Sequence, residues 1–136
     1  MLPKYRGCTV VEWALYNGDP LGVTAHLMDE GIDTGPIVAQ ATFDVADCPD
    51  YAAVRVKVYQ AGFALAATAA ADLLAGRARP VPQGPGRYWK PIEPEKMVVV
   101  QAWFARRASD AAFIADRMAA GATADQITAD LFTTKP

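Results

Sequence analysis

Asp33 is the residue of this chain whose type and setting in the sequence best suit chemistry. It lies between Gly31 and Gly35, two residues that can take a positive φ, just after a run in which Val23, Ala25 and Leu27 alternate with Thr24, His26 and Met28. Alternation with a period of two predicts a half-buried strand, so Asp33 is expected in the turn of a hairpin that continues into Ile37. A carboxylate held there can exchange a proton with a substrate, or it can simply hydrogen-bond its own turn.

His26 lies on the expected first strand and is the sole histidine of the chain. A single histidine on a strand is either a hydrogen-bonded structural residue or a group that orients a nearby carboxylate or an ordered water. The sequence predicts no metal site, because this histidine stands alone and Cys8 and Cys48 lack the spacing of metal ligands. The candidate catalytic residues are therefore Asp33 and His26.

The composition limits the partners that this chain can have. Its 136 residues allow one domain at most, and 52% of them are apolar, so a buried core is possible. The net charge is −2, the pI is near 5.3 and there is no basic run, so nucleic acid and anionic membranes are poor partners. The two cysteines fit free thiols, and we find neither a signal peptide nor the about 18 consecutive apolar residues that span a bilayer. We expect a cytoplasmic protein.

Periodicity and capping residues predict a β-hairpin packed on one long helix. Thr9 is expected to cap a short helix, with Glu12 completing a capping box. Asp47 is expected to cap the long helix, which Gly76 ends. The expected elements of this half are a loop at 1–7, a helix at 10–16, strands at 22–28 and 37–45, and a helix from 47 to about 75.

Five prolines between 77 and 94 change the character of the chain. They predict an extended arm, which either packs over the domain through Tyr88 and Trp89 or is a flexible linker. After the arm, the apolar run 97–103 predicts a strand. The remaining expected elements are a helix at 105–120, with Phe113, Ile114 and Met118 on its inner face, and a short helix at 123–131 that Thr123 caps.

Four ordered segments carry a family resemblance. They are Leu2-Pro3-Lys4-Tyr5-Arg6-Gly7, Trp13-Ala14-Leu15-Tyr16-Asn17-Gly18-Asp19, Gly22-Val23-Thr24-Ala25-His26 and Asp29-Glu30-Gly31-Ile32-Asp33-Thr34-Gly35-Pro36-Ile37. In this order and spacing, they resemble the folate-dependent formyltransferases, which include methionyl-tRNA, glycinamide ribonucleotide and sugar N-formyltransferases. The likeness covers roughly 1–45 and continues more weakly through the following helix.

The resemblance implies a fold, a cofactor and site residues. The expected fold is α/β, an incomplete formyltransferase-type mixed sheet made of a hairpin and a long packing helix, followed by a Pro-rich arm and C-terminal helices. The implied divisions are 1–76 for half of the catalytic domain, 77–96 for the arm and 97–136 for a strand and helical tail. The implied cofactor is N10-formyltetrahydrofolate, whose formyl group passes to a small-molecule amine. Asp33 matches the catalytic aspartate of the family, and the segment that borders the pterin is matched by Met28, Asp29, Glu30, Gly31 and Ile32.

The chain also departs from the family pattern. Formyltransferases carry an Asn-x-His-x-Ser segment immediately before the Leu-Pro-x-Tyr-Arg-Gly signature, which begins here at Leu2. His26 matches a different family position, so we expect half of a catalytic domain that is inactive alone, in a parent that favours a sugar amine. Three alternatives stay open: a longer working enzyme, an inactive short product, and a binding module. An incomplete sheet leaves open edges, so self-association or a complementary chain is expected.

Overall fold

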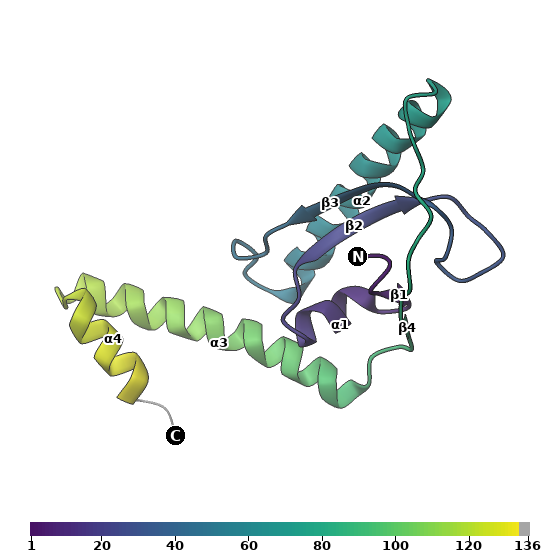
Figure 1. Cartoon of the computed structure of the whole chain (residues 1–136). Helices are drawn as coiled ribbons and strands as arrows, with labels where there is room; N and C mark the ends of the chain where they lie inside the picture. The colour runs from purple at the N-terminus through teal and green to yellow at the C-terminus, as the bar shows by residue number, and fades with distance from the viewer. Residues whose placement is uncertain (134–136) are drawn as a thin grey trace.

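A two-stranded hairpin lies against a long helix at the centre of the molecule (Figure 1). The computed structural model describes residues 1–133. In chain order, the elements are β1 (Arg6–Gly7), α1 (Val10–Tyr16), β2 (Leu21–His26), β3 (Ile37–Phe43), α2 (Tyr51–Leu74), β4 (Tyr88–Trp89), α3 (Pro94–Ala119) and α4 (Ala124–Thr133). Strands β2 and β3 pair antiparallel, and the short strands β1 and β4 pair parallel in a separate sheet. The expected mixed α/β fold is therefore confirmed.

The arm packs over the domain and contributes to its core. Trp89 is 9% exposed and its ring centroid lies 5.1 Å from that of Tyr5 and 4.6 Å from that of Trp13. The indole Nε1 of Trp89 donates to the carbonyl oxygen of Lys4 at 3.0 Å, and that of Trp13 donates to Lys90 at 2.8 Å. The prediction of a packed arm is confirmed, and the alternative of a flexible linker is wrong.

Helix α2 begins later than predicted but ends close to the expected residue. Asp50 is the N-cap, and its carboxylate accepts from the backbone N–H of Ala53 at 2.8 Å. Asp47 forms an ion pair with Lys57 at 2.7 Å instead, so the expected cap at Asp47 is wrong. The C-cap is Ala75, followed by Gly76 with a φ of 66°. Glycine takes this left-handed backbone without strain, which explains where the helix stops.

The run 97–103 is helical, so the predicted strand is wrong. Three β-branched valines suggested a strand, but Pro94 stands in the first turn of α3 and the helix continues through this run to Ala119. Val100 and Phe104 fall on one helical face and pack into the core, and no described strand pairs with this segment. Tertiary packing overrides β-propensity here.

The end of α3 and helix α4 form a hairpin that projects from the body (Figure 1). Phe113 and Ile114 are partly buried, as predicted, but Met118 is 64% exposed, so its expected inward position is wrong. Ile127 of α4 is 7% exposed. Thr123 Oγ1 accepts from the N–H of Gln126 at 3.3 Å, so the predicted cap is confirmed.

Glu12 links α1 to α2 and does not complete a capping box. Its side chain is buried and accepts from the hydroxyl of Tyr51, and it also pairs with Arg55 at 3.2 Å. Thr9 has a φ of 48° and makes no side-chain cap, and its hydroxyl accepts from the N–H of Ile92 in the arm at 2.7 Å. Thr9 is therefore the N-cap residue of α1, as predicted, but the capping box is wrong, because both polar side chains bond to distant segments of the chain.

We expect the Tyr51 hydroxyl to make stability fall in alkaline solution. Burial, together with the hydrogen bond to Glu12, raises the pKa of Tyr51 from 10.0 to about 12. Above pH 10 the unfolded chain loses this proton while the folded chain keeps it, so the free energy of unfolding falls as the pH rises towards about 12. Urea unfolding measured through this window should show a weaker pH dependence for Tyr51→Phe than for the wild type. The exposed Tyr16→Phe is the control; equal slopes for all three proteins would contradict the prediction.

Candidate functional site

The loop between β2 and β3 is closed by backbone contacts at its base. The N–H of Leu27 donates to the carbonyl oxygen of Pro36 at 2.9 Å, and Ile37 forms a bridge with Val81 of the arm. Gly35 is buried, and a Cβ atom added there would lie 1.8 Å from the carbonyl oxygen of Leu27. Neither Gly31 nor Gly35 has a positive φ. Glycine is instead needed at 35 because the backbone of Leu27 comes too close for any side chain.

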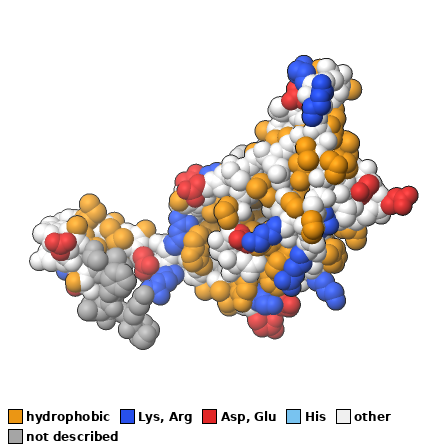
Figure 2. All heavy atoms as spheres, in the orientation of Figure 1, with side chains coloured by type: hydrophobic (Ala, Val, Ile, Leu, Met, Phe, Trp, Pro, Cys, Tyr) orange, Lys and Arg blue, Asp and Glu red, His pale blue; other side chains and the backbone are white. Residues whose placement is uncertain are grey.

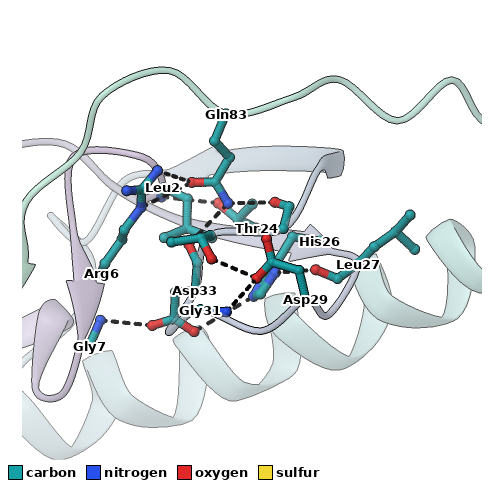
Figure 3. A network of polar contacts seen from close by, with 12 residues as sticks. Leu2, Arg6, Gly7, Thr24, His26, Leu27, Asp29, Gly31, Asp33 and Gln83 are labelled. Carbon is teal, nitrogen blue, oxygen red and sulfur yellow. Dashed lines mark hydrogen bonds and ion pairs between the residues drawn. The ribbon is translucent and has the colours of Figure 1, made fainter.

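Asp33 itself takes the left-handed conformation, with a φ of 54°. Such a backbone is uncommon outside glycine, although aspartate tolerates it better than most residues. Its Oδ2 accepts from the backbone N–H of Gly7 at 2.7 Å, and its Oδ1 lies 3.7 Å from Nε2 of His26 (Figure 3). The structure therefore brings the two candidate catalytic residues together, one from the end of β2 and one from the loop that follows.

The ring of His26 is held by its other nitrogen. Nδ1 lies 2.9 Å from the carbonyl oxygen of Leu27, which can only accept, so Nδ1 carries the proton of this contact. In the neutral ring, Nε2 is then an acceptor that faces the Asp33 carboxylate. Two acceptors 3.7 Å apart suit a group with two hydrogens to donate, such as a water or an amine.

The five expected cofactor-binding residues form an exposed acidic turn beside this pair. Oδ1 of Asp29 accepts from the Thr34 hydroxyl at 2.6 Å and from the N–H of Gly31 at 3.1 Å. The Thr34 hydrogen bond, as the largest influence, lowers the pKa of Asp29. Glu30 is also exposed, and Met28 and Ile32 are 93% and 62% exposed, so the turn presents two apolar side chains at the surface.

A cavity of about 440 Å³ runs from His26 and Asp33 along β2 towards α2. Its walls are mainly apolar, with Tyr59 and Phe63 of α2 at the far side. It lies on the edge of β2 that is not paired with β3. The lining residues of β2 are Gly22, Val23, Thr24 and His26.

Gln83 is a site residue that sequence reasoning missed. It lies in the arm, and its side chain contacts the loop that carries Asp33 and the guanidinium of Arg6 (Figure 3). The guanidinium of Arg6 donates to Oε1 of Gln83 and to the carbonyl oxygen of Gly84. The sequence feature that could have identified Gln83 is a lone amide side chain among prolines and glycines.

The described residues include no cluster of three potential metal ligands. Among the helices described, none combines the length and apolar character that crossing a bilayer requires.

An acidic hairpin loop, a long helix packed on the hairpin, and an arm that bonds to the loop and to the N-terminal segment make up an α/β unit. Residues 1–68, half of the chain, match the family model described as formyl transferase. The chain belongs to the formyl transferase family.

The similar proteins agree with this assignment. The methionyl-tRNA formyltransferase of Synechocystis sp. is 38% identical over 84 residues, which are 61% of this chain and 26% of that protein. The one from Nitratiruptor sp. is 56% identical over 46 residues, 33% of this chain and 15% of the relative. This chain therefore matches about a quarter or less of the length of these curated relatives.

Solved structures of formyltransferases share the fold. The formyltransferase PseJ from Anoxybacillus kamchatkensis, in complex with UDP-4,6-dideoxy-4-formamido-L-AltNAc and tetrahydrofolate, aligns with a TM-score of 0.63 and 27% identity. The alignment covers 73% of this chain and 53% of that one. Methionyl-tRNA formyltransferase from Clostridium thermocellum aligns with a TM-score of 0.51 and 25% identity, over 70% of this chain and 40% of that one.

Gly35→Ala should destabilise the protein by about 1–3 kcal/mol or more, because the new methyl group collides with the carbonyl oxygen of Leu27. Gly84→Ala is a matched control, since an added Cβ there meets nothing within 4 Å. Urea unfolding of the two variants measures the difference. Equal stabilities would show that the loop accommodates the added methyl group without cost.

Proposed function

We propose that this chain supplies the aspartate-bearing part of a folate-dependent site that transfers a formyl group to an amine. The observation that carries the proposal is the Asp33 carboxylate, which is held by Gly7, lies 3.7 Å from His26 and lines the cavity. It lies within the segment that matches the formyl transferase family. The reducing cytoplasm is the proposed location, consistent with the free thiols of Cys8 and Cys48.

Asp33 is the proposed proton acceptor. A carboxylate that takes a proton from an attacking amine, directly or through a water, makes the nitrogen a better nucleophile. His26 Nε2 adds a second acceptor beside it, so an amine or water that bridges both atoms is oriented by two hydrogen bonds. His26 is thus proposed to orient the reacting group, while Asp33 moves the proton.

The exposed turn Met28, Asp29, Glu30, Gly31 and Ile32 is the proposed border of the folate site. Met28 and Ile32 present apolar side chains to the surface, which a flat heterocycle can cover favourably. Asp29 is engaged within the turn and shapes it. When bound, N10-formyltetrahydrofolate supplies the formyl group.

A sugar amine is the proposed acceptor. The structure of PseJ contains a formamido sugar nucleotide, and its alignment covers more of this chain than the family model does. The net charge of −2 also disfavours a polyanionic RNA as a partner.

We expect the isolated chain to show no detectable formyl transfer from N10-formyltetrahydrofolate to an amino sugar nucleotide. The resemblance gives the family three catalytic residues, an Asn, a His and an Asp, and the described residues supply one of them, Asp33. Removal of a single oxyanion donor alone typically lowers kcat by about 100–1,000-fold. Mixing the chain with the remaining portion of PseJ should restore turnover once the two co-elute. Asp33→Asn should then reduce the rate by about 100–10,000-fold.

Turnover by the chain alone would contradict the proposed inactivity. A co-eluting pair in which Asp33→Asn and the wild type are equally active would contradict the role of the aspartate. Asp110→Asn, at a partly exposed position on α3, is the control for the charge change.

A binding or oligomerisation module is the second candidate function. The observation that favours it is the unpaired edge of β2 beside exposed apolar residues of α2, namely Tyr59 at 54% and Phe63 at 72% exposure. Figure 2 shows Lys and Arg side chains gathered at the tip where α2 meets the arm, with hydrophobic side chains below them. Strand addition at an open edge supported by an apolar wall is a common mode of association.

We therefore expect the 14.5 kDa chain to self-associate at micromolar concentration. Phe63→Asp should shift it towards the monomer in sedimentation velocity, because the charge would be buried on association. Leu74→Asp is the control, since Leu74 is 91% exposed and is the last residue of α2. A monomeric wild-type chain, or equal effects of both variants, would exclude this surface.

A further inference from the structure

One side chain of the arm holds the backbone of the Asp33 turn at two carbonyl groups. Nε2 of Gln83 donates to the carbonyl oxygen of Asp33 at 3.0 Å and to that of Gly35 at 2.6 Å. Gln83 reaches across 50 residues of sequence to do so. Its side chain is partly buried by these contacts.

Arg6 fixes which way the Gln83 amide points. Nε and Nη2 of Arg6 lie 3.3 and 3.0 Å from Oε1 of Gln83, and Nη2 also donates to the carbonyl oxygen of Gly84 at 3.0 Å. A guanidinium can only donate, so the amide oxygen must face it. The amide NH2 group is thereby directed at the two loop carbonyls, which can only accept.

The two restraints on Asp33 come from opposite sides. Figure 3 shows Gln83 on one side of the loop and the Asp33 carboxylate directed to the other, towards Gly7. The φ of 54° at Asp33 is a conformation that costs about 1–3 kcal/mol and persists where surrounding contacts determine it. Gln83 provides such contacts through the carbonyl oxygens of Asp33 and Gly35.

We propose that Gln83 is a positioning residue for Asp33: through the backbone carbonyls of the turn, it orients the carboxylate towards Gly7 and His26. The site thereby extends into the arm, beyond residues 1–68 that match the family model. The significance for catalysis rests on the proposed role of Asp33, but the positioning itself can be measured without turnover.

Three neighbouring backbone amides allow the test in the full chain. The N–H of Gly7 donates to the Asp33 carboxylate, whereas those of Arg6 and Cys8 donate to Arg87 and Trp89 of the arm. Hydrogen exchange followed by NMR at each amide therefore separates a displaced Asp33 from a detached arm. Gln83→Glu is the informative variant, because it keeps an acceptor for Arg6 and loses both donors to the loop.

In Gln83→Glu we expect the protection of the Gly7 amide to fall by at least about tenfold, as expected for the loss of a charge-assisted hydrogen bond. The amides of Arg6 and Cys8 should stay within about threefold of the wild type, since the sheet of β1 and β4 remains. Asp33→Gly is the reference variant: it removes the acceptor of the Gly7 amide and tolerates the positive φ, so it gives the exchange rate of that amide without its hydrogen bond. Gln101→Glu, exposed on α3, controls for the added charge.

Two results would overturn the proposal. One is unchanged protection of Gly7 in Gln83→Glu. The other is an equal loss at Arg6, Gly7 and Cys8, which would make Gln83 a structural attachment of the arm and nothing more. If Gly7 responds alone but Asp33→Asn remains active in the reassembled enzyme, the positioning stands and the catalytic role of Asp33 fails.

Discussion

The packing of Trp89 between the N-terminal loop and α1 is the contact on which the rest of the structure depends. Its indole lies against the rings of Tyr5 and Trp13 and donates to the backbone of Lys4, so one residue of the arm joins two segments near the start of the chain. Burial of such an aromatic side chain contributes about 1.5–3 kcal/mol. This contact also sets β4 beside β1, and β1 carries both Arg6 and Gly7. The position of the arm therefore sets the contacts that Gln83 and β1 make with Asp33.

Asp33 combines a left-handed backbone with hydrogen bonds to both its carboxylate and its own carbonyl oxygen. Asp33 accepts from a backbone amide on one side, while its own carbonyl accepts from a side chain on the other. Such two-sided restraint leaves the carboxylate little conformational freedom. The partner imidazole is similarly fixed, because Nδ1 is occupied by the carbonyl oxygen of Leu27.

The sequence predicted the local features of this fold better than the distant ones. The hairpin, the acidic turn and the end of α2 depend on alternation, on Asp33 and on Gly76, all of which act within a few residues. Glu12 has the spacing of a capping residue and instead bonds to Tyr51 on another helix. Tertiary packing therefore determines the hydrogen-bond partner of Glu12.

The strand predicted at 97–103 failed for a related reason. Its valines have β-propensity, yet no described strand pairs with that segment, and helical spacing places Val100 and Phe104 against the core. Gln83 was missed because an amide in a Pro-rich segment has no periodic signal. Its role exists only once Arg6 and the loop are adjacent in space.

The parallel pairing of β1 with β4 has a consequence for how the molecule forms. The contact between Trp89 and Lys4 closes a loop of 85 residues, whose entropic cost exceeds that of a ten-residue loop by about 2 kcal/mol. The hairpin and α2 can assemble earlier from short-range contacts, as topology generally favours. During synthesis, the carboxylate of Asp33 therefore acquires its final surroundings only after Trp89 has left the ribosome.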